Sequence, residues 1–302
     1  MSLTVLVTGA TGFVGGHLVG PLLEQGHAVR AMTRRPDAYD GPAEAVFGDV
    51  EDPASLEGAM EGVDVAYYFV HSLDSADFAE KDAAAARNFG KAAAACGVRQ
   101  IIYLGGLGAD EAPKKLSPHL RSRRECEGHL AEAGVPVTVL RAAIVIGHGG
   151  ISWELTRQLV KNLPLMIAPK WVSTRSQPIA LTDVIRYLVG VLDNDEAKGR
   201  VLEIGGSDVL TYREMMERAS LVMNGRRAHI VQVPLLSPRL SSYWLSLITD
   251  VDVITARHLI DSMDNEVVVT DDTITTLVPG DALGYDDSVR QALRSREEAG
   301  TA

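Results

Sequence analysis

Three glycines near the N-terminus have the spacing of a site that binds a diphosphate. Gly9, Gly12 and Gly15 follow a short apolar run and open a helical pattern. Glycine at such a junction permits a tight turn, a close approach of the backbone to the anion and close packing of the helix on the strand. A flexible turn is the alternative, but the strand-to-helix context favours a dinucleotide site. The predicted contacts are Gly9, Ala10, Thr11, Gly12, Phe13, Val14 and Gly15.

Two adjacent arginines follow the next predicted strand, where the residue that distinguishes the two pyridine dinucleotides is expected. An acid at this place would bind the ribose 2′-hydroxyl of NAD(H), whereas a base would hold the 2′-phosphate of NADP(H). This chain has Arg34 and Arg35, and the nearest acid, Asp37, lies beyond a proline. Guanidinium groups bind a phosphate through paired hydrogen bonds. NADP(H) is therefore the favoured cofactor, with NAD(H) possible and two solvated arginines as the plainer interpretation.

A carboxylate after the third predicted strand extends this site. Asp49 and Val50 are placed to reach the adenine end of a dinucleotide. Asp49 could instead cap the helix that follows, since aspartate is a favoured N-cap residue, or one side chain could do both.

The first half of the chain alternates short apolar runs with helical patterns, which predicts a parallel sheet with crossover helices. The strand runs are apolar almost throughout, as expected for strands covered on both faces. Predicted strands span residues 3–8, 28–33, 45–48, 63–70, 100–104 and 137–141. Predicted helices span residues 13–25, 53–61, 76–95 and 117–133. The predicted fold class is α/β, a doubly wound parallel sheet of the Rossmann type.

After about residue 147 the pattern becomes less regular and predicts a smaller mixed cap on the carboxyl edge of the sheet. Thr211 and Glu214 form a capping box at the start of one helix. Other helices are predicted over residues 151–162, 181–192, 236–249, 253–263 and 288–297, and a strand over 200–204. We therefore predict a dinucleotide-binding domain over residues 1–147 and a cap over 148–302, which form one rigid body with a cleft between them.

Several of these segments resemble the short-chain dehydrogenase/reductase superfamily. The similarity lies in the glycine spacing, in Gly48-Asp49-Val50, in Asn88 on the alanine-rich helix and in residues 141–147. Residues 69–72, 119–123 and 177–183 are similar to its atypical, extended branch, the NmrA-like NAD(P)H-binding proteins, which includes the Rossmann-fold accessory subunit of respiratory complex I. The resemblance covers nearly the whole chain and implies further cofactor contacts at Phe69, Val70, His71, Leu104 and Gly105.

The resemblance also implies a catalytic serine after the fifth strand, a tyrosine, and a lysine four residues after it, and this chain lacks all three. Gly105 and Gly106 stand where the serine is expected, His119 at the tyrosine place and Arg123 at the lysine place. Imidazole titrates near neutral pH and could donate the proton, while the guanidinium stabilises negative charge and lowers the imidazole pKa. A solvated polar start to the helix is the alternative to this catalytic pair.

Other candidate side chains lie before and after this pair. Lys114 and Lys115 are second choices for the base, although surface lysines are the commoner case. The loop and helix that follow the sixth strand should pass the substrate, and aromatic and cationic groups there suit a planar or anionic ligand. Burial in the core of the cap is the alternative for the tryptophans, of which we expect one to face the cleft. The substrate candidates are His148, Trp153, Trp171 and Arg175.

Composition and charge narrow the function classes. The 46% apolar content of 302 residues is that of a folded chain with a core. The net charge is −11, and residues 250–302 hold 12 acidic and 4 basic side chains, which favours a solvated acidic surface. No cluster of lysine and arginine supports binding to nucleic acid. Cys96 and Cys126 have no spacing typical of a disulfide framework or of metal ligands, so no metal is expected.

No targeting or membrane-spanning segment is expected, so we predict a cytoplasmic protein. The N-terminal apolar run ends at Gly9 without a basic leader. Residues 231–249 are apolar but interrupted by Pro234, Pro238 and Arg239, so they are expected in the core, although they could lie on a membrane or cap a pocket. The chain is a monomer or a homodimer; the helix over residues 83–95 could pair across a two-fold axis or pack on its own sheet.

Three functions follow from these observations. The leading hypothesis is an oxidoreductase that uses NADP(H) to reduce or oxidise a small carbonyl, quinone or enone. The second is a protein that binds NADP(H) to sense redox state or to support an assembly and catalyses nothing, as the missing serine and tyrosine suggest. The third, a nucleotide-sugar epimerase or dehydratase, fits the length but needs the absent tyrosine and lysine.

Overall fold

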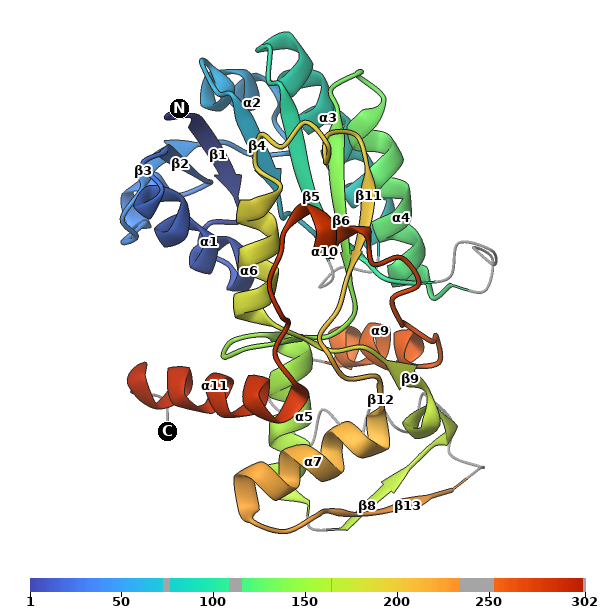
Figure 1. The fold of residues 1–302 in the computed structure, drawn as a ribbon. Coiled ribbons are helices and arrows are strands. Elements are labelled where there is room, and N and C mark those ends of the chain that lie inside the picture. The colour runs from blue at the N-terminus through green and yellow to red at the C-terminus, as the bar shows by residue number, and fades with distance from the viewer. Residues whose placement is uncertain (73–76, 109–115, 164, 234–252, 301–302) are drawn as a thin grey trace.

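A seven-stranded parallel sheet forms the centre of the molecule (Figure 1). The computed structural model describes residues 1–72, 77–108, 116–163, 165–233 and 253–300. The order of the strands in the sheet reverses between the first and the fourth strand of the chain, which lie side by side. The predicted doubly wound α/β class is therefore confirmed. From one edge to the other the strands are β11 (Val201–Ile204), β6 (Val137–Ala142), β5 (Gln100–Gly106), β4 (Val65–Tyr68), β1 (Thr4–Thr8), β2 (Ala28–Thr33) and β3 (Glu44–Phe47).

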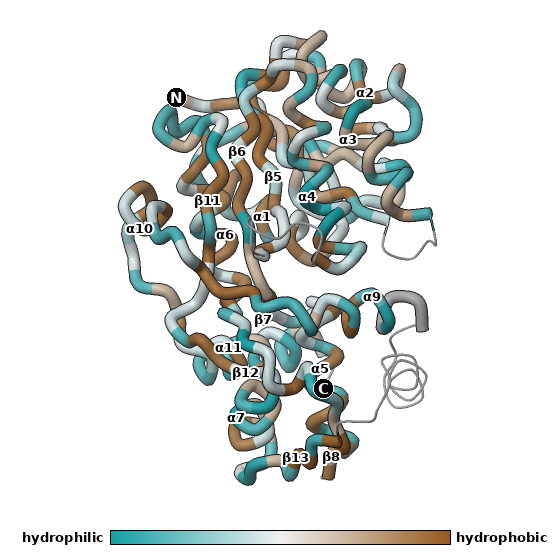
Figure 2. Tube along the Cα trace, turned by 90° about the vertical axis from the view of Figure 1, so that its right-hand side faces the viewer, coloured by the Kyte–Doolittle hydropathy of each residue, from teal (hydrophilic) through white to brown (hydrophobic). Residues whose placement is uncertain are grey.

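Helices cover both faces of this sheet. On one face α1 (Phe13–Glu24) packs against α6 (Leu181–Gly190), and on the other α2 (Pro53–Met60), α3 (Phe78–Ala95) and α4 (Pro118–Ala131) pack side by side. Each layer has its own apolar core. Every residue of β4 is buried, and Figure 2 shows hydrophobic residues following the strands of the sheet. The near-continuous apolar runs of the sequence therefore reflect burial on two faces.

The close approach of α3 and α4 fixes the position of α4. A Cβ on Gly90 of α3 would lie 2.6 Å from the carbonyl oxygen of Leu130 on α4, so glycine allows the two backbones to touch. The buried alanines of α3 pack on the molecule's own sheet. At its start α4 has Pro118 in the first turn and Ser117 as N-cap, whose hydroxyl accepts a hydrogen bond from the Leu120 amide at 3.2 Å.

The cap has its own core and its own small sheets. The predicted capping box is confirmed, because Thr211 and Glu214 exchange both hydrogen bonds. Helices lie at α5 (Ile151–Asn162), α7 (Tyr212–Asn224), α9 (Val253–Met263) and α11 (Tyr285–Glu298), and short 3₁₀ helices at η1 (Pro36–Ala38) and η3 (Lys170–Ser173). The strand pairs are β7 (Val145–Ile146) with β10 (Ile179–Ala180), β9 (Arg175–Ser176) with β12 (Leu210–Thr211), and β8 (Leu165–Ala168) with β13 (His229–Gln232).

The chain does not divide at residue 147 as simply as predicted. β11 adds to the sheet beside β6, with Val201 aligned to Val139. α6 packs on α1, and α10 (Thr273–Leu277) packs on β11. Residues beyond 147 thus supply one strand and two helices to the dinucleotide-binding half, because an open edge of β6 would leave main-chain groups without partners. The predicted helix over residues 236–249 lies outside the described residues. Within the described ranges, no helix combines the length and the hydropathy needed to cross a bilayer.

Candidate functional site

The turn after β1 forms a cradle for an anion. Gly9 has φ +60°, which glycine adopts without strain, and its carbonyl accepts a hydrogen bond from the Gly12 amide at 2.8 Å. A Cβ on Gly15 would lie 2.3 Å from the Gly9 carbonyl oxygen, so α1 can start against the turn only with glycine there. Among the described residues, the first turn of α1 has no side-chain cap and no acid. Its amide groups therefore point at a place suited to a diphosphate, as predicted.

The cradle opens into a cavity of about 440 Å³ at the carboxyl ends of β1, β2, β3 and β4. Ligands of open parallel sheets bind at this edge, next to the reversal of strand order. Nine predicted cofactor residues line it, namely Gly9, Thr11, Arg34, Arg35, Asp49, Val50, Phe69, Val70 and His71. The sequence did not predict Met32, Thr33, Gly48, Glu51, Ser72 and Lys81, which complete the wall. The shape and the donor groups of this cavity fit a dinucleotide.

Three cations lie along this cavity. Arg34 and Arg35 are exposed, and within the part of the chain that the structure describes neither guanidinium has an ion-pair partner. Lys81 enters from the first turn of α3, and its Nζ lies 3.0 Å from Asp77 Oδ1. Sequence reasoning missed this lysine, although a helix that follows a strand in a βα unit starts at this edge of the sheet and a lysine in its first turn was a usable signal.

The loop after β3 shows how Asp49 and Val50 are held. Asp49 Oδ1 accepts a hydrogen bond from the Glu51 amide at 3.0 Å. The alternative role predicted for Asp49 is wrong, because Asp52 is the N-cap of α2 and accepts from the amide of residue 54. Asn88 of α3 donates its Nδ2 hydrogen to the Val50 carbonyl at 2.9 Å and so fixes the loop against the helix.

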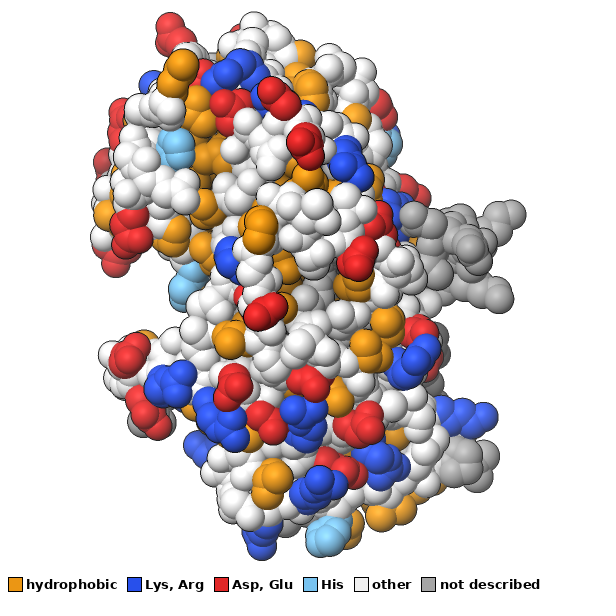
Figure 3. Space-filling model, in the orientation of Figure 1, with side chains coloured by type: hydrophobic (Ala, Val, Ile, Leu, Met, Phe, Trp, Pro, Cys, Tyr) orange, Lys and Arg blue, Asp and Glu red, His pale blue; other side chains and the backbone are white. Residues whose placement is uncertain are grey.

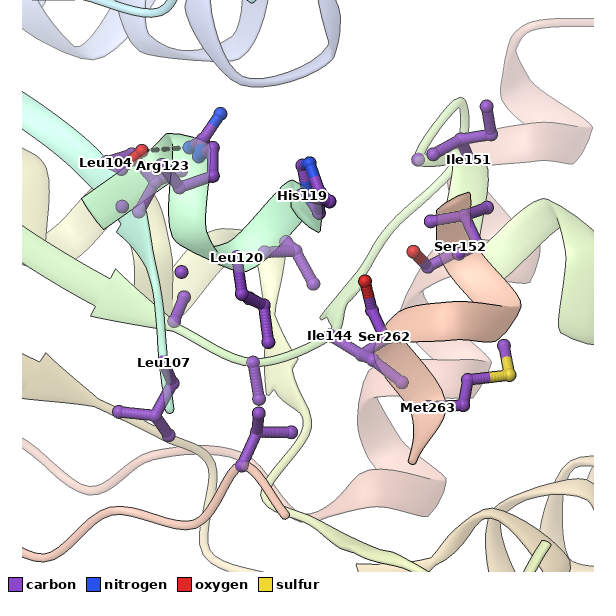
Figure 4. A pocket seen from close by; sticks show the side chains of 18 of the residues that line it. Leu104, Leu107, His119, Leu120, Arg123, Ile144, Ile151, Ser152, Ser262 and Met263 are labelled. Atoms are coloured by element: carbon purple, nitrogen blue, oxygen red, sulfur yellow. Dashed lines mark hydrogen bonds between the residues drawn. The ribbon is translucent and has the colours of Figure 1, made fainter. Parts of the chain in front are cut away.

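A second cavity, of about 240 Å³, adjoins the first at His71, which lines both. It lies at the ends of β5 and β6, between α4, α5 and α9 (Figure 4). The predicted residues in its wall are Phe13, His71, Leu104, Gly105, His119 and Arg123. The wall is otherwise mostly apolar and includes Leu107, Leu120, Ile144, Ile151, Leu259 and Met263. The reacting end of a dinucleotide in the first cavity would thus meet an apolar chamber.

Gly105 and Gly106 leave no side chain at the end of β5, where the resemblance implies a hydroxyl. A Cβ on Gly106 would come 2.8 Å from Leu120 Cδ2, and a Cβ on Gly105 would come 3.0 Å from Glu127 Oε1. Both contacts are with side chains of α4, which packs on β5. A serine at position 106 would therefore require the Leu120 side chain, next to His119, to change its position.

Arg123 is fixed at the end of β5. Its Nη2 donates a hydrogen bond to the Leu104 carbonyl oxygen, drawn as a dashed line in Figure 4, and its guanidinium carbon lies 5.2 Å from the centre of the Tyr103 ring. Because residues four apart share a helix face, its positive charge stays beside His119, one turn earlier on α4. The structure therefore brings the two predicted catalytic residues to one chamber.

The protonation of His119 differs from the sequence expectation. Burial is the main cause that lowers its pKa, to about 3, and the charges of Arg123, His71 and His258 lower it further. The imidazole is therefore neutral at physiological pH rather than titrating near neutrality. A neutral ring still has one N–H group, which can donate a hydrogen bond but is a far weaker acid than imidazolium.

Replacing His119 by asparagine is expected to reduce the loss of stability on acidification. The unfolded imidazole titrates at 6.5 and the folded one at about 3. Below pH 6.5 the unfolded chain takes up a proton that the folded chain refuses, so stability that is complete above pH 6.5 is lost as the pH falls toward 3. Melting temperatures measured from pH 7 to 4 should fall more steeply for the wild type than for His119→Asn. Parallel curves would contradict a neutral, half-buried imidazole.

α9 forms one side of the chamber, a role that the sequence did not predict. The hydroxyl of Ser117, at the start of α4, lies 2.9 Å from the hydroxyl of Ser262 on α9. The Ser117 amide donates a hydrogen bond to Asn265 Oδ1, just after α9, at 3.0 Å. The Phe78 ring of α3 packs edge-on against His258, with 4.8 Å between ring centres. The predicted second-choice bases Lys114 and Lys115 lie outside the described residues.

Neither tryptophan predicted near the substrate lines this chamber. Trp153 is fully buried, and Trp171 is 7% exposed. Both belong to the core of the cap, where the ring of Trp171 meets that of Tyr212 edge-on at 5.7 Å. Their large apolar area stabilises the cap, so the alternative considered for them is the one observed. Tyr212 and Ser152 line the chamber in their place.

The two polar substrate candidates also lie elsewhere. Arg175 is exposed and forms a two-pronged ion pair with Glu266, at 2.8 and 3.0 Å. His148 lies 3.5 Å from Glu154 and lines a separate cavity of about 210 Å³ between α1, α6 and α11. Sequence proximity to the sixth strand was a poor guide, because the chain leaves the chamber after β7 and, of the loop and helix that follow directly, only residues 150–152 line it.

Comparison with known proteins agrees with this geometry. A family model described as NAD(P)H-binding matches residues 9–167, which include the cradle, the arginine pair and His119. This chain belongs to the NAD(P)H-binding family. Its membership confirms the predicted type of cofactor site, and the family description covers both NADH and NADPH.

The proteins to which this chain is similar include reductases. The chain is 30% identical over 230 residues to the (4-alkanoyl-5-oxo-2,5-dihydrofuran-3-yl)methyl phosphate reductase of Streptomyces griseus, covering 72% of this chain and 73% of the relative. It is 28% identical over 259 residues to ceramide reductase of Caulobacter vibrioides, covering 80% and 78%. Its fold is similar to that of the NADPH-dependent quinone oxidoreductase of Escherichia coli in complex with NADPH, with TM-score 0.77, 19% identity and coverage of 96% and 99%.

Proposed function

We propose that this protein is an NADPH-dependent reductase of an apolar carbonyl, quinone or enone. The observation that carries the proposal is the junction at His71, where a dinucleotide cavity meets an apolar chamber that holds His119 and Arg123. Two relatives named as reductases, one acting on an unsaturated lactone and one on a lipid by their names, support the reaction class.

The preference for NADPH over NADH rests on the arginine pair. Arg34 and Arg35 follow β2, at the rim of the cavity where the adenosine ribose of a dinucleotide would lie. Arg34 directly follows the last residue of β2. The next acid along the chain, Asp37, lies in η1, beyond Pro36. A 2′-phosphate would give these two cations a partner, whereas NADH would leave them solvated.

The residues of the chamber suit a polar bond that gains negative charge. Bound NADPH would supply the hydride. The neutral imidazole of His119 donates a hydrogen bond to the substrate oxygen, and Arg123 adds a fixed positive charge beside it. The mostly apolar wall lowers the local dielectric constant, which strengthens both interactions. Since imidazole with a pKa near 3 is a poor proton source at neutral pH, the proton comes from solvent after the oxygen is charged.

Replacing His119 by alanine is expected to lower kcat roughly 100- to 1000-fold, the effect of losing one hydrogen-bond donor to a developing oxyanion. Oxidation of NADPH would be followed with quinones, aldehydes and enones. His129→Ala is a matched control on the same helix, since His129 lies away from the chamber and pairs with Glu132 at 2.6 Å. Full turnover by His119→Ala would contradict the role given to His119.

A second function is favoured by one specific observation. Gly105 and Gly106 place no hydroxyl at the end of β5, where the resemblance implies the catalytic serine, and His119 stands at the place of the tyrosine. This is expected of a protein that binds NADP(H) and reports its redox state, or supports an assembly, without turnover. Tight binding of NADPH with no oxidation by any substrate class in the panel would favour this function over reduction.

A further inference from the structure

The cap ends in a two-stranded sheet with an apolar outer surface. β8 and β13 run parallel, with Leu165 aligned to His229 and Ile167 to Val231. Side chains alternate between the faces of a strand, and the residues between these are buried in the cap core. Leu165, Ile167 and Val231 are 57%, 54% and 50% exposed. We call the surface formed by Leu165, Ile167, His229 and Val231 the cap face; Figure 1 shows its strands at the end of the molecule remote from the central sheet.

Exposed cations gather at one edge of the cap face. Parallel strands start at the same edge, so Lys161, just before β8, and Arg226 and Arg227, just before β13, lie beside it. A hydrogen bond of 3.5 Å from Asn224 Nδ2 to the Val160 carbonyl joins the two chain segments there. All three side chains are exposed, and Arg227 Nη1 lies 3.9 Å from Glu217 Oε2. Figure 3 shows Lys and Arg next to hydrophobic side chains at this end of the molecule.

The segments that carry the two strands contain no acid. Residues 155–182 and 218–249 include no aspartate or glutamate, although the chain has 40 acidic residues and a net charge of −11. They contain basic residues throughout, among them Lys161, Lys170 and Arg226. In an acidic protein, a surface built from segments that hold basic but no acidic residues has the charge that complements an anionic partner.

We propose that the cap face docks on the surface of a bilayer that contains anionic lipid. Three half-exposed aliphatic side chains are suited to enter the interface between headgroups and acyl chains, while the cations at their edge meet lipid phosphates. A nucleic acid would not use the aliphatic side chains, and a neutral protein surface would not use the cations. This docking is peripheral and is separate from the dinucleotide and substrate cavities.

Vesicle sedimentation with the full chain tests the proposal. The protein is expected to bind vesicles of phosphatidylcholine with phosphatidylglycerol at least tenfold more tightly than vesicles of phosphatidylcholine alone. Most of this binding should be lost at about 1 M salt, where charges are screened beyond about 3 Å. Ile167→Asp should weaken binding on the order of tenfold and Arg226→Glu about fivefold or more.

Matched variants separate the cap face from general effects of charge. Two control variants are expected to bind like the wild type. One is Phe47→Asp on β3, where the side chain is 53% exposed, and the other is Lys91→Glu, at an exposed residue of α3. Melting temperatures show that each variant is folded. Equal binding to both kinds of vesicle, no binding to either, or equal losses in the control variants would overturn the proposal. Binding of the protein to polyglutamate but not to vesicles would also overturn it and would indicate an acidic protein partner. Self-association that Ile167→Asp abolishes, without binding to vesicles, would overturn it and would indicate a second copy of the chain.

Discussion

Replacing Gly15 by alanine is expected to weaken NADPH binding roughly 100-fold and to destabilise the fold. The new methyl group would lie 2.3 Å from the Gly9 carbonyl oxygen and 2.8 Å from its carbonyl carbon. These atoms belong to backbone, so the turn itself must move, and forced overpacking of this kind costs about 1 to 3 kcal/mol. The amide groups that face the diphosphate move with the turn. Titration of NADPH by its fluorescence would measure the change.

Gly58→Ala is the matched control for this substitution. Gly58 lies on helix α2, outside the dinucleotide cavity, and a Cβ there meets nothing within 4 Å. Alanine at this place should leave NADPH binding unchanged and raise stability by about 0.5 to 1 kcal/mol, since glycine is a poor helix former. The two glycines are thus expected to respond with opposite signs in a melting experiment. Wild-type affinity in Gly15→Ala would refute the cradle as the site of the diphosphate.

Replacing Arg34 and Arg35 together by alanine is expected to raise the dissociation constant of NADPH by roughly 100- to 10,000-fold. Hydrogen bonds to charged groups contribute about 1.5 to 3 kcal/mol each, and no ion pair with another described residue competes for either guanidinium. NADH has no 2′-phosphate, so its dissociation constant should change by no more than about twofold. Parallel titrations with both coenzymes would measure the ratio.

Arg294→Ala, on α11 and outside both cavities, controls for the loss of positive charge from an acidic protein. It should bind both coenzymes like the wild type. Equal losses of NADPH and NADH in the double variant would show that the arginines act on the diphosphate or on the fold, and would contradict the assignment of the 2′-phosphate.

Much of the fold was predictable because its signals are local. The helices over 151–162 and 253–263 begin and end where the sequence indicated, since start and stop signals act within a turn or two of the helix end. The last helix begins at Tyr285 rather than at residue 288, because Asp286 and Asp287 stabilise an earlier first turn. β11 was predicted as a strand, but its place beside β6 was not. Strand pairing depends on which edge is open after the other strands have assembled.

The candidate site likewise has one part that the sequence predicts and one part that depends on tertiary packing. The sequence by itself determined the dinucleotide cradle and its arginines, because a strand, a turn and a helix start bring those residues together within a single βα unit. Only the tertiary structure decided the chamber at the ends of β5 and β6. Its wall combines α4, α5 and α9, and its chemistry depends on packing, because Leu120 packs against Gly106 and desolvation keeps His119 neutral. Such contacts join residues far apart in the chain, so they follow from how the layers pack and are not encoded in any one segment.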